Sequence, residues 1–297
     1  MSGCQVKGGS LEIRHGHLRR LELDRTTFDW MGTAVEVDAP ALEAMSASGL
    51  LLCEALAVRG SPQLRSLVVE NCFARKEEAL GVSLEVEAPG VRRFRFVGAV
   101  GRVCSMGASP HLDDVEVEVH PWREGEDGDN SRWVGELLKG VSCARSLTLS
   151  AGCLQCLTTE MGTPETLPNP FHHLKVLKLE VGLVSEELPG IACLLRSSPN
   201  LQTLSISLGD ESHDATTDSV SLDYELQNLD QLYGDYWESQ ESPINCLVHH
   251  LKRIEISNYR GKRLEEELAR FLVTNAMVLK EMPISTLTSS FSGFDFL

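Results

Sequence analysis

The sequence predicts an α/β fold: a repeat solenoid with a curved parallel sheet, short convex helices and a C-terminal helix–strand cap. Two observations predict it. A six-residue pattern, apolar-x-x-apolar-x-apolar, recurs, and successive copies start 21 to 32 residues apart except for one interval of 50. The copies begin at Leu18, Leu42, Leu64, Val91, Leu112, Ala144, Leu174, Leu201, Leu251 and Leu279.

The pattern has a direct physical reading. Its last two apolar positions alternate with polar ones, so they point to one side of a short strand. One such unit cannot bury its own apolar side, whereas stacked units share a continuous core. The spacing lies at or just above the period of leucine-rich repeats, which identifies the expected unit.

Helices are predicted before some of the strands. The segment Trp133–Leu149 aligns with Gly190–Ile206, and each places a leucine pair on a short helix ahead of the next strand. The segment Glu267–Ile284 follows the same scheme. Its strand contains Pro283, which has no N–H for a ladder, so this strand is expected at a sheet edge.

The chain is expected to form one continuous array. Residues 1–242 are predicted to hold degenerate repeats, including an acidic insertion at 209–242, and residues 243–297 to form the cap. From Gly209 to Asn245 there are ten acidic residues and no Lys or Arg. The first part of this stretch is expected to be a solvated loop. Its second part, LDYELQNLDQLYGDYW, which ends at Trp237, is expected to form a short helix that packs its leucines and aromatics on the array.

Bulk composition excludes several function classes. The 43 acidic and 27 basic residues give a formal charge of −16, which disfavours nucleic acid and anionic membranes as partners. No signal peptide and no apolar run long enough to span a bilayer is visible. Nine cysteines with irregular spacing suit a reducing compartment, so cytoplasm or nucleus is expected.

No catalytic residue, metal ligand or cofactor site is predicted. The lone CxxC of Cys153 and Cys156 lacks the second ligand pair of a zinc site. Two His-His pairs, at 172–173 and 249–250, precede strands at equivalent repeat positions, which favours a structural role. Carboxylates at 113–114 and 265–267 stand at a strand start and in a first helical turn. An enzyme using such pairs is kept as a remote alternative.

The strongest functional candidates are polar side chains that the strands direct away from the core, onto the concave side. Cations and carboxylates are expected there on neighbouring strands. One interpretation is mutual charge pairing across strands, and the other is a stripe that binds a partner protein. The stripe residues are Arg93, Arg95, Asp114, Glu116, Glu118 and Lys178.

Two stretches resemble a known family. The closing segment, from WESQESPINCL through ELARFLVTNAMVLKEM, is similar to the FBD region that ends many plant F-box/LRR proteins. The segments LRRLELDRTTF, HHLKVLKL and SSPNLQTLSISL resemble the degenerate repeats of the same proteins. The resemblance implies a protein-interaction module, the substrate-recognition half of an F-box subunit of a cullin–RING ubiquitin ligase, with a protein substrate and no cofactor.

The resemblance does not extend to an F-box. Residues 1–17 are too few to hold one before the first repeat. A Skp-type adaptor is therefore an expected partner only if an F-box is supplied. The alternative is a free leucine-rich-repeat scaffold or competitor that is unconnected to ubiquitination.

Overall fold

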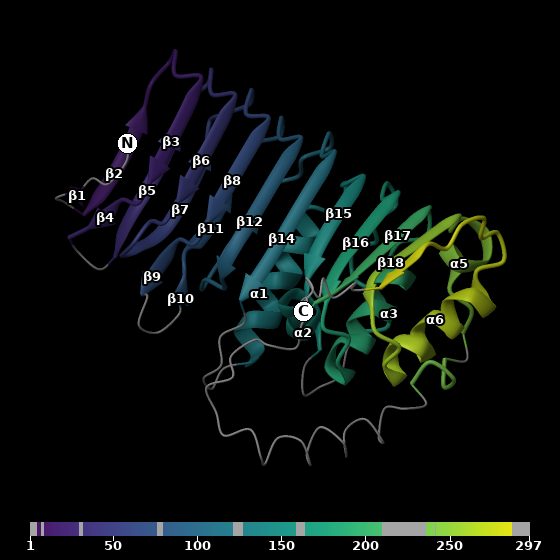
Figure 1. The fold of residues 1–297 in the computed structure, drawn as a ribbon. Helices are drawn as coiled ribbons and strands as arrows, with labels where there is room; N and C mark the ends of the chain where they lie inside the picture. The colour runs from purple at the N-terminus through teal and green to yellow at the C-terminus, as the bar shows by residue number, and fades with distance from the viewer. Residues whose placement is uncertain are drawn as a thin grey trace, which may run out of the picture.

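Ten parallel strands, one for each copy of the six-residue pattern, form the main sheet (Figure 1). The computed structural model describes residues 5–6, 9–29, 32–75, 80–120, 127–158, 164–209, 236–240 and 242–286. In spatial order the strands are β3 (Arg20–Asp24), β6 (Ala44–Ser48), β8 (Ser66–Glu70), β12 (Arg93–Ala99), β14 (Asp114–His120), β15 (Ser146–Ser150), β16 (Val176–Val181), β17 (Thr203–Leu208), β18 (Arg253–Tyr259) and β19 (Ile284–Thr286).

Apolar positions of successive copies lie opposite one another. Leu147 pairs in register with Leu177, Leu177 with Leu204, and Leu204 with Ile254. All four side chains are fully buried. The weak copy at Leu42 behaves in the same way, because Met45 and the alanine two residues later are also buried. The six-residue pattern therefore located the strands of this sheet correctly.

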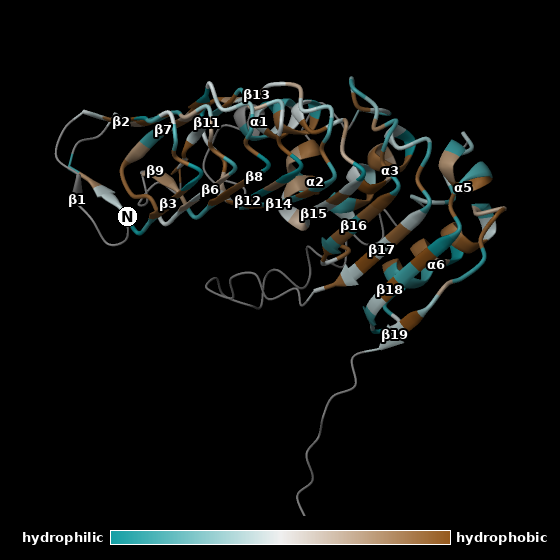
Figure 2. Cartoon of the chain, turned by 90° about the horizontal axis from the view of Figure 1, so that it is seen from above, coloured by the Kyte–Doolittle hydropathy of each residue, from teal (hydrophilic) through white to brown (hydrophobic). Residues whose placement is uncertain are grey.

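A second parallel sheet, rather than a row of short helices, lies behind the N-terminal strands of the main sheet. It consists of β2 (Ser10–Arg14), β5 (Thr33–Asp38), β7 (Cys53–Arg59), β11 (Ser83–Val86) and β13 (Cys104–Met106). Figure 2 shows this sheet as a separate layer beside the N-terminal strands of the main sheet. The helices named from the sequence lie only in later segments, and this sheet was not anticipated. Segments such as Thr33–Asp38 nevertheless alternate apolar and polar residues and contain β-branched valines, which favour strands.

Two smaller sheets and the helices complete the described structure. β1 (Gln5–Val6) pairs with β4 (Thr27–Phe28), and β9 (Phe73–Arg75) pairs with β10 (Leu80–Gly81). The helices are α1 (Asp127–Gly140), α2 (Ala151–Leu157), the 3₁₀ turn η1 (Ser185–Glu187), α3 (Leu188–Ser197), α5 (Asn245–His249) and α6 (Arg263–Asn275). No helix in the described ranges is long and apolar enough to cross a membrane.

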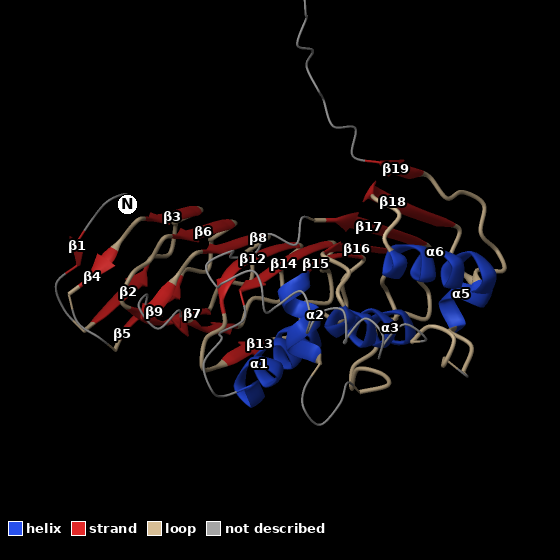
Figure 3. Cartoon of the chain, turned by 60° about the horizontal axis from the view of Figure 1, so that its bottom comes forward, coloured by secondary structure: helices blue, strands red, loops and turns tan. Residues whose placement is uncertain are grey.

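The helices lie on the same side of the main sheet as the second sheet (Figure 3). α1, α3 and α6 overlap the three segments where the sequence predicts helices, and each begins a few residues earlier. Trp133 anchors α1, since its buried ring packs on Phe96 at 4.9 Å and its Nε1 donates to the Val103 carbonyl at 3.2 Å. This mixed α/β arrangement, with large parallel sheets and few helices, is consistent with a leucine-rich-repeat-like fold.

The C-terminal strand lies at the edge of the main sheet, as Pro283 predicts. β19 follows β18 at the end of the sheet order, and the Pro283 carbonyl accepts a hydrogen bond from Ile256 N at 3.0 Å. One expectation was wrong: Ile284 is 47% exposed and not a core residue. The register between β18 and β19 shifts after this residue, and no described strand continues the stack beyond it.

α6 buries one apolar face and receives an aromatic partner from the preceding segment. Leu264, Leu268 and Leu272 are buried, and Phe271 packs against the buried Trp237 with ring centroids 4.6 Å apart. The expected packing of Trp237 on the array is thereby confirmed. The rest of the acidic insertion, 210–235, lies outside the described residues.

Two buried glutamates shape the loops that lead into α3 and α6. Glu187 accepts backbone hydrogen bonds from Leu183 and Val184. Glu265 accepts them from Arg260 at 2.8 Å and Gly261 at 2.9 Å. Gly261 has a positive φ of 75°, which glycine adopts without strain. Each carboxylate thus satisfies backbone donors at a helix start.

Candidate protein-interaction face

One face of the main sheet is covered by no described helix or strand (Figures 2 and 3). We call it the open face. Its residues alternate with the buried apolar ones, and neighbouring strands are in register, so they form lanes across the sheet. The six predicted stripe residues all occupy strand positions on this face: Arg93 and Arg95 on β12, Asp114, Glu116 and Glu118 on β14, and Lys178 on β16.

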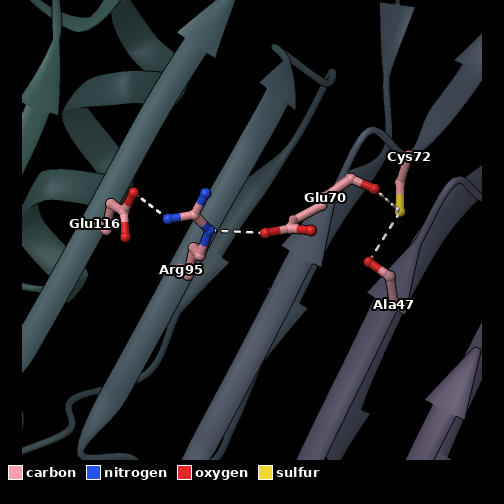
Figure 4. Close-up of polar contacts among 5 residues, drawn as sticks. All are labelled: Ala47, Glu70, Cys72, Arg95 and Glu116. Atoms are coloured by element: carbon pink, nitrogen blue, oxygen red, sulfur yellow. Dashed lines mark hydrogen bonds and ion pairs between the residues drawn. The ribbon is translucent and has the colours of Figure 1, made fainter.

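Arg95 is held between two carboxylates. It stands opposite Glu116 in the register, forms an ion pair with it, and donates from Nε to Glu70 Oε1 at 2.7 Å (Figure 4). The hydrogen bond to Glu70, followed by the one to Glu116, raises the pKa of the Arg95 guanidinium. The charge-pairing interpretation is therefore confirmed for Arg95, which links β8, β12 and β14.

Three other predicted stripe residues have no ion-pair partner in the described structure. Within the described ranges, no ion pair involves Arg93, Asp114 or Lys178, and all three are exposed. Arg93 and Asp114 stand opposite each other in the register without forming a pair. Glu118 lies near His120, with Oε1 3.8 Å from Nε2.

Short hydroxyl side chains make up much of the open face toward the C-terminus. Ser146 and Thr148 on β15, and Thr203 and Ser205 on β17, flank the β16 strand that carries Lys178. All four are partly exposed. The alternation in the segments SLTLS and TLSISL predicts that they face this way, although the six predicted stripe residues are all charged. Small side chains leave room for another molecule to approach the sheet closely.

The cysteines single out no reactive centre. Cys153 and Cys156 are buried in α2, and the Cys153 thiol donates to the Val117 carbonyl at 3.4 Å. Burial raises the pKa of Cys153 to about 11 and that of Cys156 to about 12. Their surroundings therefore favour the protonated, unreactive thiol.

The histidine and carboxylate pairs are likewise placed in ordinary structural settings. His172, His173 and His249 are exposed in the approach to strands β16 and β18. Asp113 lies 3.3 Å from Arg92 and 3.8 Å from Arg145. In the described part of the chain, no group of three or more His, Cys, Asp or Glu side chains is arranged to hold a metal ion.

Comparison with known proteins shows that the closing segment matches a family model. The FBD family model matches residues 238–284, which include α5, β18, α6 and the start of β19. The chain has an FBD region and is a relative of plant F-box/FBD/LRR-repeat proteins. The FBD region thus coincides with the end of the main sheet and with the helix against which Trp237 packs.

The similarity to these relatives extends beyond the FBD region. A putative F-box/FBD/LRR-repeat protein of Arabidopsis thaliana is 26% identical over 89% of this chain and 51% of its own length. An FBD-associated F-box protein of the same plant is 27% identical over 67% of this chain and 39% of its own length. The chain therefore spans about half the length of the curated relatives it matches, or less. No solved structure matches it.

Proposed function

We propose that this chain is a protein-recognition module built as a leucine-rich-repeat solenoid, and that the open face receives its protein partner. In this proposal residues 1–242 form the repeat array and residues 243–297 close it. The supporting observation is the open face itself: nine successive strands, β3 to β18, align polar side chains there. Extended sheet faces of repeat proteins commonly serve as binding surfaces.

The chemistry of the open face fits a polar protein surface. Arg93, Asp114 and Lys178 offer charges without ion-pair partners in the described residues. Asp114 and Lys178 also stand on strands next to the hydroxyls of β15 and β17. Such groups steer association and define register, while short neighbours permit close approach. Arg95 is proposed to stabilise the platform, since two carboxylates already engage it.

A more specific proposal follows from the relatives. Their names place F-box, FBD and LRR-repeat segments in one protein, and we propose that this chain supplies the substrate-receiving part of an F-box-type ubiquitin ligase subunit. Partners bound on the open face would then be the substrates to which the ligase attaches ubiquitin. The alternative is a scaffold that binds the same partners without affecting their turnover.

Proximity labelling in plant cells, read by mass spectrometry, tests the open face. The test variant carries Thr148→Trp and Ser205→Trp, which fill the middle lane between β15 and β17. The matched control carries Ala55→Trp and Ser83→Trp on the outer side of the second sheet. We expect the test variant to lose a defined set of labelled proteins that the control retains. Loss only in the control would contradict the proposed face.

The ligase role has its own readout. Proteins whose labelling depends on the open face should accumulate, and lose ubiquitin conjugates, when the gene is disrupted. Unchanged abundance and conjugation of these proteins would favour the scaffold alternative while leaving the interaction face intact.

A further inference from the structure

A row of residues leads into the strands of the main sheet, along one margin of the open face. We call this row the leading rim. Its members are Arg19, Glu43, Arg65, Arg92, Asp113, Arg145, Lys175, Gln202, Lys252 and Lys280. Backbone hydrogen bonds stack them: Lys175 N donates to Arg145 O at 2.8 Å, Gln202 N to Lys175 O at 3.0 Å, Lys252 N to Gln202 O at 2.9 Å and Lys280 N to Lys252 O at 2.8 Å.

The leading rim is basic in an acidic protein. Seven of its ten members are Lys or Arg and two are carboxylates, whereas the whole chain has a formal charge of −16. The lane at the opposite ends of the strands has the reverse character. That lane consists of Asp24, Ser48, Glu70, Val97, Glu118, Ser150, Glu180, Ser207 and Ser257, with four acids and no Lys or Arg. Charge is thus segregated across the width of the sheet.

Carboxylates occupy the N-terminal part of the leading rim. Glu43 lies 3.8 Å from Arg19, and Asp113 lies 3.3 Å from Arg92. Asp113 also lies 3.8 Å from Arg145, whose side chain is 75% exposed. The N-terminal cations are therefore partly neutralised on the surface.

The last three cations of the leading rim have no such partners in the described structure. Within the described residues, Lys175, Lys252 and Lys280 form no ion pair, and Lys175 Nζ donates only to the Asn200 carbonyl at 3.4 Å. The nearby Glu281 carboxylate is engaged by Arg253. Arg145, Lys175, Lys252 and Lys280, with Gln202 between them, form what we call the basic rim.

We propose that the basic rim docks an extended acidic segment of a partner polypeptide. Four steps between stacked strands span roughly 19 Å, the length of about six residues of extended chain. The ammonium groups stand on flexible stems, so they can meet carboxylates at varied spacing. This surface is separate from the polar lanes of the open face, and acidic-peptide binding here does not depend on the proposed ligase role.

A nucleic acid fits the basic rim less well. Proteins that bind single strands combine cations with aromatic platforms for base stacking, and the leading rim contains no aromatic member. An acidic polypeptide segment needs no such aromatic platform.

The test uses the full chain and fluorescence anisotropy of labelled octaglutamate at about 0.1 M salt, where the Debye length is about 10 Å. We expect octaglutamate to bind and octaglutamine not to bind. The triple variant Lys175→Glu, Lys252→Glu and Lys280→Glu should weaken binding at least tenfold. The corresponding Lys→Gln variant should give a smaller loss.

A matched control distinguishes the effect of the basic rim from the effect of net charge. Arg14→Glu, Arg102→Glu and Arg270→Glu change exposed residues away from the leading rim by the same total charge, and should alter binding less than threefold. Equal losses in both triple variants, or no binding by the natural chain, would overturn the proposal. Tighter binding of an eight-residue oligothymidine than of octaglutamate would replace it with nucleic-acid docking. Circular dichroism checks that each variant is folded.

Discussion

Glu187 Oε2 accepts a hydrogen bond from the Leu183 N–H at 2.8 Å, and only 1% of Glu187 is exposed. Leu183 has a positive φ of 57°, so the carboxylate stabilises a loop conformation that leucine rarely adopts. Glu265 does the equivalent work before α6. Two units far apart in the chain therefore use the same device to connect a strand to a helix.

Removing the Glu187 carboxylate should destabilise the protein. Glu187→Ala leaves the Leu183 and Val184 N–H groups without their acceptor, and we expect a loss of about 1–3 kcal/mol in the free energy of unfolding. Glu187→Gln retains an acceptor oxygen and should cost less. Urea denaturation at pH 7 measures both, and equal losses for the two variants would contradict the capping role.

The same residue predicts a pH dependence. Burial raises the pKa of Glu187, although hydrogen bonds from Leu183, Val184 and Gly182 lower it in part. The folded state then holds the proton to higher pH than the unfolded state, so stability falls as pH rises through the window between the two pKa values. The difference in stability between Glu187→Gln and the natural chain should shift in favour of the variant from pH 4 to pH 7. Denaturation curves across this range measure it.

Glu265 and Glu266 provide a comparison between adjacent residues. Glu265 is 4% exposed and accepts hydrogen bonds from Arg260, Gly261 and Lys262, whereas Glu266 is exposed. Glu265→Ala should lower the free energy of unfolding by about 1–3 kcal/mol. Glu266→Ala should change it by less than about 0.5 kcal/mol. In Glu265→Ala, hydrogen exchange should show reduced protection first in the initial turn of α6. Equal effects of the two variants on stability would contradict the capping role of Glu265.

Trp237 should contribute strongly to the stability of the FBD region. Its ring is buried against Phe271, so Trp237→Ala should cost about 3–5 kcal/mol. Trp237→Phe keeps an aromatic face and removes a buried Nε1 that has no hydrogen-bond partner in the described structure. It should therefore cost much less. Thermal unfolding of the two variants measures these losses. A small loss of stability in Trp237→Ala would show that the contact between Trp237 and Phe271 contributes little.

Arg93 and Arg95 should separate binding from stability. Arg95→Gln breaks two partly exposed ion pairs, each worth about 0.2–1 kcal/mol, and the loss should shrink as salt rises. Arg93→Gln breaks no ion pair in the described structure, so stability should stay within about 0.5 kcal/mol while partner capture falls. Denaturation at two salt concentrations, alongside proximity labelling, measures both. A large stability loss for Arg93→Gln would contradict this division.

Several features were predictable because they depend on local pattern. Alternation after Leu64 or Leu174 determines which side chains enter the core, so the strands of the main sheet could be located in advance. Pro283 likewise marked an edge strand, since it lacks a ladder donor. The second sheet was not anticipated, although the alternation in Thr33–Asp38 favours a strand. The capping role of Glu187 was missed, because it depends on a loop conformation that residue types alone do not reveal.

The sequence by itself determined the period of the units, the strand positions and the resemblance to FBD proteins, because each depends on residues close together in the chain. The tertiary structure decided which side chains meet between units. It paired Arg95 with Glu70 and Glu116, left Arg93 without an ion pair among the described residues, and aligned Lys175, Lys252 and Lys280 along one margin. These relationships depend on the register of stacked strands, which brings distant residues to neighbouring positions and which the pattern of a single unit does not contain.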